Sequence, residues 1–275
     1  MFSQLCNAVD KVPPARLILA DESVLLLLHR CPSLLGARVA IARDHRKPLR
    51  AEQSVAQSIV TVVAAGGGVC TGTMIAPNII LTAAHCIAPG TANRVIDYSS
   101  KPPALIAPQQ VAVHPKYNAQ SIAAHRATAD VALLRLSAPM PGKSAAPLGL
   151  PRIPFTPVSR FTVVGIGSTV AGSDTGVGTV RAAPLAVTGQ PGTLQVRLVD
   201  PQTQNKSSGM GACTGDSGAP AFEDQDGRSV ITGVVSWSTG ANNAAGCGGL
   251  TGVTPLTLYK DWIVKTARSW GAAIP

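Results

Sequence analysis

Two short segments contain residue types that together can perform nucleophilic catalysis. One reads Cys213-Thr214-Gly215-Asp216-Ser217-Gly218-Ala219-Pro220, and the other reads Thr82-Ala83-Ala84-His85-Cys86. A serine hydroxyl is a weak nucleophile until a base removes its proton, and histidine is the usual base near neutral pH. If His85 and Ser217 meet in space, we expect a hydrolase that works through a covalent acyl intermediate.

The composition predicts a folded chain rich in short strands. Of the 275 residues, 45% are hydrophobic and 13% are charged, which argues against disorder of the whole chain. The apolar residues come mainly as short Val/Ile/Leu runs between the 27 glycines and 22 prolines. This pattern is typical of strands joined by turns.

The net charge of +9 raises the question of an anionic partner, such as nucleic acid or a membrane surface. Residues 1–50 hold eight Lys/Arg and four Asp/Glu, and the remaining excess is scattered without a basic run. We therefore expect no nucleic-acid partner. No stretch reaches the roughly 18 uninterrupted apolar residues of a membrane-spanning helix, so we expect no stable membrane insertion.

The six cysteines contain no C-x-x-C pair, which disfavours a zinc or redox site, and we expect neither a metal nor a cofactor. Cys70 and Cys86 bracket a strand-like segment, and Cys213 and Cys247 bracket the turn of Ser217. Both pairs fit local disulfides beside a reactive site, which implies an oxidising compartment and a secreted or periplasmic protein. The alternative is six free buried thiols in a cytosolic protein.

Residues 1–50 are predicted to be a leader or pro-segment, poorly ordered or helical, and residues 51–275 to be the functional domain. A signal peptide needs a basic start and a continuous apolar core, and the mixed composition of residues 1–19 does not supply them. Cys6 and Cys31 lie in this segment, and we expect no structural role for them in the domain.

Runs typical of strands cover residues 58–65, 69–75, 78–81, 104–113, 131–136, 161–165, 178–187, 193–199, 219–222 and 230–237. A helical turn is expected at 83–87, and a hairpin turn carrying Asp226-Gly227 at 223–228. Residues 256–270 show helical spacing and predict an amphipathic C-terminal helix. Roughly a dozen short strands with one terminal helix favour paired antiparallel barrels.

His85, Asp130 and Ser217 follow one another in the sequence, each at the edge of a strand-like run. With these residues the chain resembles the chymotrypsin-like (trypsin-fold) serine peptidases over about residues 55–270. The resemblance rests on Thr82-Ala83-Ala84-His85-Cys86, Ala129-Asp130-Val131-Ala132-Leu133-Leu134, Gly215-Asp216-Ser217-Gly218-Ala219-Pro220 and Ser236-Trp237. It implies an all-β fold: two packed six-stranded antiparallel Greek-key barrels, with a cleft between them and a C-terminal α-helix.

The resemblance also implies the roles of the three residues in a serine-type endopeptidase. Ser217 would attack the scissile carbonyl, His85 would take its proton and return it to the leaving amine, and Asp130 would orient the imidazole. The backbone N–H groups of Gly215 and Ser217 would form the oxyanion hole. The expected partners are protein or peptide substrates, and the expected state is a monomer.

In the family, the acid that corresponds to Asp216 of this chain pairs with a new N-terminal ammonium after zymogen cleavage. Here the best candidate for that terminus is Val39, freed by cleavage after Arg38. The family usually has two glycines shortly after the new terminus, and this chain has none there. The alternative for Asp216 is a turn-capping aspartate.

By the same resemblance, five residues are expected to bind the substrate, three of them in the primary specificity pocket. Gly211 stands where trypsin-like members carry an aspartate, and Ser238 and Gly252 fall on the pocket walls. Ser236 and Trp237 would line the cleft and hold the substrate backbone, although Trp237 could also be a core residue. Because glycine offers no charge to a substrate Lys or Arg, we expect a preference for an uncharged, small-to-medium apolar residue before the cleaved bond.

Other functions remain to be compared with this one. A catalytically silent homologue used as a secreted binding module would need a broken triad or oxyanion loop, and the motifs are intact. A chaperone-like intracellular peptidase is a second alternative, but such proteins usually carry an appended peptide-binding domain. A third is surface adhesion through the excess of basic residues, for which the sequence contains no motif. Calcium binding is disfavoured because residues 87–113 contain one acid, Asp97.

Overall fold

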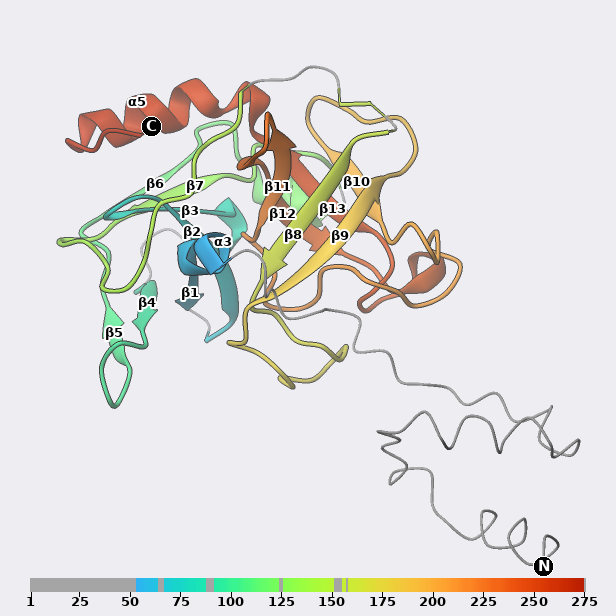
Figure 1. Ribbon diagram of the computed structural model, residues 1–275, viewed down its shortest axis with the longest axis horizontal. Coiled ribbons are helices and arrows are strands. Elements are labelled where there is room, and N and C mark those ends of the chain that lie inside the picture. The colour runs from blue at the N-terminus through green and yellow to red at the C-terminus, as the bar shows by residue number, and fades with distance from the viewer. Residues whose placement is uncertain are drawn as a thin grey trace, which may run out of the picture. The chain divides into compact units, whose positions relative to one another are not determined.

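The computed structural model of the chain describes residues 53–63, 67–87, 92–123, 126–150, 155–156 and 158–274 (Figure 1). The predicted leader segment 1–50 lies outside the described residues, and with it Val39, Cys6 and Cys31. The described chain is mostly antiparallel β-structure in two sheets. The all-β prediction is therefore confirmed.

The first sheet has seven strands in the order β5-β4-β1-β2-β3-β7-β6. The strands are β1 (Ile59–Val63), β2 (Val69–Ala76), β3 (Ile79–Thr82), β4 (Arg94–Asp97), β5 (Ala104–Ile106), β6 (Gln110–Val113) and β7 (Ala132–Arg135). Although β5 and β6 are opposite edges of this sheet, only residues 107–109 separate them. Such a linker spans at most about 14 Å, so the sheet must curl until its edges approach each other.

The predicted strand over 104–113 is thus two strands, β5 and β6. Pro108 lies between them and has no backbone N–H to donate to a ladder. One bent segment therefore pairs with β4 through β5 and with β7 through β6. The first sheet is therefore a curved half-barrel of seven short strands, where a closed barrel of six strands was expected.

The second sheet is a closed six-stranded barrel in the order β10-β13-β12-β11-β8-β9. Its strands are β8 (Arg160–Gly165), β9 (Arg181–Val187), β10 (Val196–Val199), β11 (Pro220–Gln225), β12 (Arg228–Ser238) and β13 (Thr251–Pro255). The hairpin β11–β12 turns at Asp226 and Gly227, whose φ angles of 57° and 75° are those that a two-residue hairpin loop requires. The expected turn over 223–228 is therefore shorter than predicted. The sequence analysis did not find β4 and β13.

The described helices are short. They are α3 (Gln53–Ser58), α4 (Ala119–Ala123), α5 (Lys260–Ser269) and the 3-10 turns η4 (Ala84–Cys86), η5 (Ala241–Asn243) and η6 (Leu256–Leu258). The helix predicted over 256–270 therefore begins with a 3-10 turn and becomes α-helical at Lys260. None of the described helices has the length and apolar character needed to cross a membrane.

His114 attaches α5 to the first sheet just after β6. Its ring lies edge-on to the rings of Tyr259 and Trp262, with centroids 4.9 Å away in both cases. Its Nδ1 accepts a hydrogen bond from the N–H of Lys116 at 3.2 Å. Burial lowers the pKa of His114, and the neighbouring Lys116 charge lowers it further. The folded protein therefore favours the neutral imidazole.

This environment predicts a pH-dependent stability. Because the pKa of His114 is lower in the folded chain than in the unfolded chain, the unfolded chain takes up the proton first as the pH falls. The contribution of His114 is complete above its ordinary pKa of about 6.5 and is lost as the pH falls through the folded value. Melting temperatures at about pH 7.5 and about pH 5.5 should differ more for the wild type than for His114→Asn. Equal differences would contradict this assignment.

Candidate active site

Strand register brings His85 and Asp130 together. Thr82 at the end of β3 pairs with Ala132 at the start of β7. Because the strands are antiparallel, the residues after β3 and the residues before β7 leave the sheet at the same end of this strand pair. His85 lies three residues after Thr82 and Asp130 two residues before Ala132, so both lie at this end.

The Asp130 carboxylate is fully buried and has three hydrogen-bond donors. Oδ1 accepts from the backbone N–H of His85 at 2.9 Å, and Oδ2 lies 2.7 Å from His85 Nδ1. Ser236 Oγ on β12 donates to Oδ2 at 2.5 Å. A carboxylate only accepts, so His85 Nδ1 carries the proton, and Nε2 is left as an acceptor.

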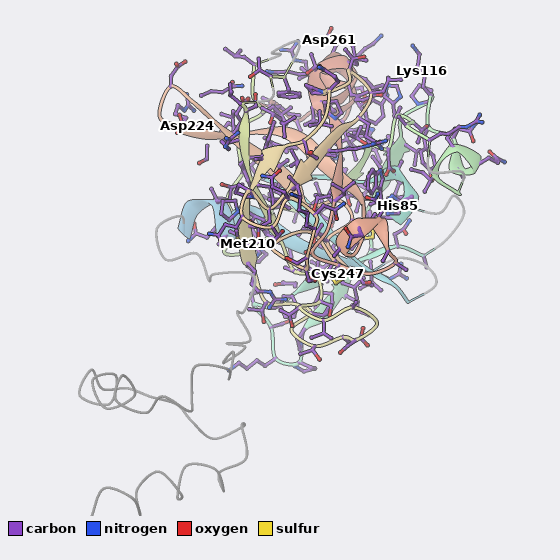
Figure 2. All side chains as sticks on the ribbon, turned by 90° about the vertical axis from the view of Figure 1, so that its right-hand side faces the viewer. His85, Lys116, Met210, Asp224, Cys247 and Asp261 are labelled. Carbon is purple, nitrogen blue, oxygen red and sulfur yellow. A yellow bond between two sulfur atoms is a disulfide. The ribbon has the colours of Figure 1, made fainter. Side chains whose placement is uncertain are left out.

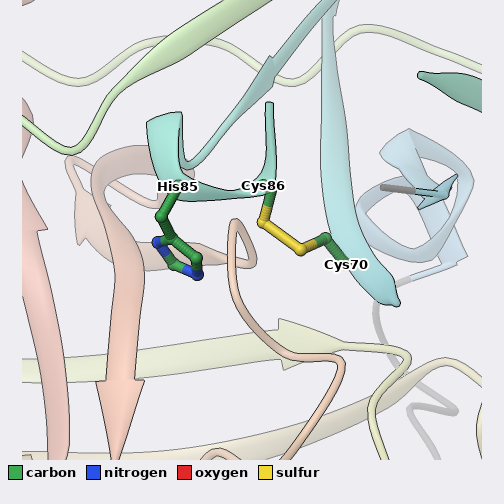
Figure 3. A group of neighbouring side chains, drawn as sticks. All are labelled: Cys70, His85 and Cys86. Atoms are coloured by element: carbon green, nitrogen blue, oxygen red, sulfur yellow. A yellow bond between two sulfur atoms is a disulfide. The ribbon is translucent and has the colours of Figure 1, made fainter. Parts of the chain in front are cut away.

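A disulfide fixes the 3-10 turn that carries His85. Cys86, the next residue, is bonded to Cys70 on β2, as predicted, and Figure 3 shows the imidazole beside this bond. Closing this 16-residue separation contributes stability on the order of 3 kcal/mol in the chain-entropy account. The sulfurs of Cys70 and Cys86 also lie close enough to His85 for a metal site, but their mutual bond leaves no thiolate to coordinate an ion.

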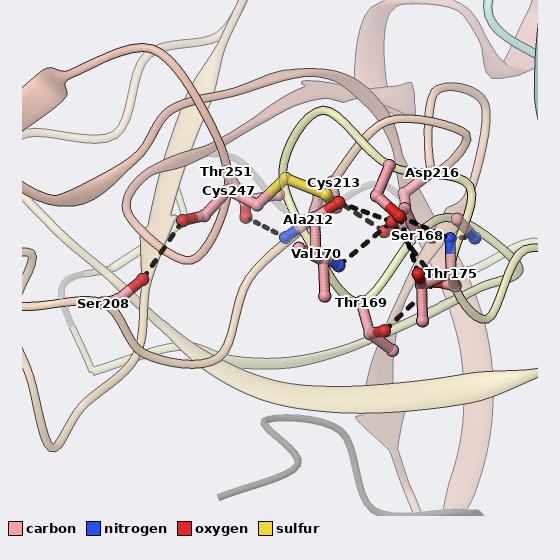
Figure 4. The surroundings of a disulfide bond; sticks show 12 residues. Ser168, Thr169, Val170, Thr175, Ser208, Ala212, Cys213, Asp216, Cys247 and Thr251 are labelled. Atoms are coloured by element: carbon pink, nitrogen blue, oxygen red, sulfur yellow. Dashed lines mark hydrogen bonds between the residues drawn. A yellow bond between two sulfur atoms is a disulfide. The ribbon is translucent and has the colours of Figure 1, made fainter. Parts of the chain in front are cut away.

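Ser217 lies in a loop whose shape depends on two glycines. Gly215 and Gly218 have φ angles of +93° and +83°, which side-chain-bearing residues rarely adopt. A Cβ on Gly218 would lie 2.2 Å from Thr71 O, so the backbone here is in close contact with β2. The predicted disulfide between Cys213 and Cys247 closes the base of this loop (Figure 4).

The orientation of the Gly215 N–H follows from the other end of its peptide. The Thr214 carbonyl accepts a hydrogen bond from the N–H of Ser168 at 2.8 Å. In a trans peptide the C=O and N–H groups point in opposite directions. The N–H of Gly215 therefore points away from Ser168, and in the described part of the chain it donates to no acceptor.

The N–H of Ser217 is fixed in the same manner. The carbonyl of Asp216 accepts from the N–H of Ala219 at 2.9 Å, so the N–H of Ser217 points the opposite way. It too has no acceptor among the described residues, whereas the N–H groups of Asp216, Gly218 and Ala219 all donate. The loop thus keeps two N–H groups available for a ligand with negative charge.

Thr71 on β2 forms hydrogen bonds with the loop of Ser217. Its N–H donates to Ser217 O at 2.8 Å, and its Oγ1 donates to Gly215 O at 2.8 Å. The same oxygen accepts from Ile166 N at 3.3 Å, and the carbonyl of Thr71 accepts from Thr82 Oγ1 at 2.8 Å. Thr71 is fully buried. Through these hydrogen bonds it connects residues of both sheets to the two carbonyls on either side of Asp216.

The Asp216 side chain is buried and does not line the cleft that contains Ser217. Oδ1 accepts from Gly167 N at 2.8 Å, and Oδ2 accepts from Cys213 N at 2.8 Å, as the dashed lines around Asp216 in Figure 4 indicate. The hydrogen bond to Cys213 is the turn-capping contact that the sequence left as an alternative. The expected pairing with Val39 concerns a residue outside the described ranges.

His85 and Ser217 line one open cleft of about 450 Å³. Its other walls include Gly215, Ser236, Trp237 and Ser238. Among the described residues no hydrogen bond joins Ser217 Oγ to His85, and such bonds often tighten only when substrate is bound. The acids Asp224 and Asp261 lie well away from His85 (Figure 2).

The remaining two residues expected in the pocket, Gly211 and Gly252, are not among the residues that line this cleft. A Cβ on Gly252 would lie 2.0 Å from the Trp237 ring, so this glycine is the surface on which the ring rests. A Cβ on Gly211 would meet Gly248 at 3.3 Å. The described lining contains no Asp, Glu, Lys or Arg.

Sequence reasoning missed one residue of this site, Thr71. Its hydroxyl acts on a backbone group far away in the sequence, since Thr71 Oγ1 and its partner Gly215 are separated by 144 positions. The signal that could have suggested Thr71 is its position directly after Cys70.

One cleft contains the His85 imidazole, the Ser217 hydroxyl and the two directed N–H groups of Gly215 and Ser217. Groups of these kinds can together carry out acyl transfer. Comparison with known proteins agrees with this chemistry. A profile of the trypsin family matches residues 47–263. The chain is 28% identical to human kallikrein-8 over 74% of this chain and 78% of that protein, and 28% identical to a trypsin-like protease of Streptomyces glaucescens over 73% and 75%.

A solved structure titled "Atomic resolution structure of HBP" has the same fold, with a TM-score of 0.62, 22% identity, and coverage of 81% of this chain and 96% of that one. The match with the family profile extends over most of the chain and includes His85, Asp130 and Ser217. The chain therefore belongs to the trypsin family of serine-type endopeptidases.

Proposed function

We propose that the protein cleaves peptide bonds with His85, Asp130 and Ser217 as a catalytic triad. The observation that carries this proposal is the loop of Ser217, which presents to the cleft two N–H groups that have no acceptor among the described residues, and His85 lines the same cleft. Asp130 fixes the tautomer of His85, so that the unprotonated Nε2 can accept a proton as the base.

The reaction then proceeds in two acyl-transfer steps. His85 Nε2 takes the proton of Ser217 Oγ while Oγ bonds to the scissile carbonyl carbon, and the negative charge moves to the carbonyl oxygen. The N–H groups of Gly215 and Ser217 donate to that oxygen. His85 returns the proton to the leaving amine, the C–N bond breaks, and water then hydrolyses the acyl-enzyme by the same route.

The cleft also supports the proposed preference for an uncharged residue before the cleaved bond. No charged side chain lines its described wall, so a substrate Arg or Lys would lose water without gaining a counter-ion. The two disulfides support an oxidising compartment, and we propose that the protein is secreted or periplasmic.

The second candidate is a catalytically silent homologue that serves as a secreted binding module. It would explain the absent Ser217–His85 hydrogen bond. It would not explain why the loop directs the N–H groups of Gly215 and Ser217 to the cleft without an acceptor among the described residues, an arrangement that suits an oxyanion.

A fluorophosphonate probe tests the nucleophile. We expect the wild type to be labelled once per chain, and Ser217→Ala and His85→Ala to lose labelling, because the former lacks the attacking oxygen and the latter its base. Intact-protein mass spectrometry measures the adduct.

Ser269→Ala is the control for this experiment, since Ser269 is exposed on α5 and its hydroxyl donates to Thr266 O. It should be labelled at the wild-type rate. Labelling that persists in Ser217→Ala would contradict the proposal, and a folded wild type that is never labelled would favour the silent homologue.

Thr71 should affect turnover more than substrate binding. Thr71→Val keeps the shape but leaves Gly215 O without its buried donor, at a cost of about 1–3 kcal/mol. If the loop loses its alignment by that amount, kcat falls about 10-fold to about 100-fold, while KM changes little. Thr71→Ser keeps the hydroxyl and should restore most of kcat. Equal losses in the Val and Ser variants would show that the hydroxyl is not responsible.

Chromogenic peptides that differ only in the residue before the cleaved bond test the specificity. We expect kcat/KM for Ala, Leu or Phe to exceed that for Arg by at least about tenfold, because an unpaired cation is poorly solvated in the cleft. A clear preference for Arg would reject the proposed pocket.

A further inference from the structure

A second open cavity, of about 670 Å³, has one charged side chain in its described wall, that of Arg197 on β10. Most of the remaining wall consists of glycines and of amide and hydroxyl side chains, and none of its described residues is Asp, Glu or Lys. Ala127 belongs to this wall and lies three residues before Asp130. Three residues span at most about 11 Å, so the cavity lies close to the buried carboxylate. We call this cavity the Arg197 groove.

Trp237 connects the cleft of Ser217 to this groove. Trp237 on β12 pairs with Gly252 on β13, and Gly252 pairs with Arg197 on β10, so the three residues form one row across the barrel. A Cβ on Gly252 would lie 2.0 Å from the Trp237 ring, so the ring occupies the space beside this glycine. Opposed residues in an antiparallel pair project from the same face. Trp237, which lines the cleft, and Arg197, which lines the groove, therefore lie on one face of the barrel.

The backbone after β12 makes the same connection. Ser238 lines the cleft, and the next residue, Thr239, donates its N–H to Leu250 O at 2.9 Å. Thr239 Oγ1 accepts from Leu250 N at 3.0 Å. Leu250 lines the Arg197 groove. The groove thus begins where the cleft ends, just past Ser238.

β12 has an unpaired edge along the cleft. Its ladder with β11 ends at the pair of Val234 and Pro220, so residues 236–238 have no partner on β11. The same three residues line the cleft. An extended peptide can add a strand to an edge of this kind, where main-chain hydrogen bonds hold it. We therefore expect a substrate to lie along residues 236–238.

The direction of this added strand follows from the position of Ser217. Val235 exchanges hydrogen bonds with the two residues that follow Ser217, so Ser217 lies near the start of the unpaired edge. Every ladder of the barrel is antiparallel, and an antiparallel substrate strand would run from Ser238 toward Ser217. If the residue before the cleaved bond lies beside Ser236, the third residue before that bond lies beside Ser238. The third or fourth residue then reaches the Arg197 groove.

The guanidinium of Arg197 is available to such a residue. Its side chain is exposed, and it has no hydrogen bond or ion pair with another described residue. A guanidinium has five N–H donors in a planar fork that matches a carboxylate. No acid in the described wall competes for these donors. The groove thus offers a counter-ion to a carboxylate side chain, whereas a lysine would meet a like charge.

We propose that the Arg197 groove binds the third or fourth residue before the cleaved bond and that Arg197 selects an acidic side chain there. The preferred substrate then combines an uncharged residue at the bond with Asp or Glu upstream of it. This inference rests on the proposed function, since it concerns substrates of Ser217. The alternative is that Arg197 is only a solvated surface charge, and the experiment must exclude it.

Peptides that share one apolar residue before the cleaved bond test the inference. Glu, Gln or Lys is placed in turn at the third or the fourth position before that bond. At one of these positions wild-type kcat/KM should be about fivefold higher for Glu than for Gln, as expected for one exposed ion pair, and lowest for Lys. The gain should appear in KM rather than kcat, because the contact is the same in the ground and transition states. Salt at about 0.5 M should reduce it.

Variants of Arg197 assign the preference to its charge. Arg197→Gln should cleave the Glu and Gln peptides with equal kcat/KM, and Arg197→Glu should prefer Lys to Glu. Arg160→Gln is the matched control, because Arg160 is exposed at the start of β8 and donates to the carbonyls of residues 158 and 159. It should keep the wild-type preference. Each ratio compares peptides on one protein, so a partial loss of folded protein cancels.

The wild-type peptide series stands even if an Arg197 variant fails to fold. Equal wild-type kcat/KM for Glu, Gln and Lys at both positions overturns the inference and leaves the proposed function intact. A Glu preference that persists unchanged in Arg197→Gln overturns the role of Arg197. A wild type that cleaves none of these peptides and is never labelled by the fluorophosphonate defeats the proposed function instead.

Discussion

A carboxylate with no access to solvent governs the arrangement of the cleft. Asp130 can remain buried only because donors from both sheets reach it, His85 from the edge of the first and Ser236 from β12 of the second. Leaving such a charge unmet would cost several kcal/mol, so the two sheets are held in the one relative placement that satisfies it. The ring of His85 takes its orientation and tautomer from the same requirement.

The loop of Ser217 is organised by a second, neutral set of hydrogen bonds. Thr71 binds the carbonyls of Gly215 and Ser217, and Ser168 binds the carbonyl of Thr214, so that successive peptide planes have no freedom to rotate. A glycine-rich segment would otherwise have high conformational entropy. The contacts behind the loop, rather than those inside the cleft, therefore create the preorganised donors on which oxyanion stabilisation depends.

Much of this site could be predicted from the sequence because its signals are local. Strand-like runs located most of the ladders, and the motifs around His85 and Ser217 located the cleft. Thr71 could not be found in this way, because its partners are backbone groups brought near by the fold, for example Ile166, 95 positions from Thr71. The bend at Pro108 was readable, since proline interrupts a ladder. Whether Gly211 lines the cleft depends on loop packing that no local pattern records, and it is not among the described lining residues.

The most direct test of the account is a crystal structure of the protein with a peptidyl boronate, which forms a tetrahedral adduct with a serine nucleophile. We predict boron bonded to Ser217 Oγ and one boronate oxygen about 2.7–3.1 Å from the nitrogens of both Gly215 and Ser217. His85 Nε2 should lie within hydrogen-bond distance of the adduct, with Nδ1 still on Asp130. An adduct whose oxygens face solvent, with the N–H groups of the loop turned away, would contradict the account.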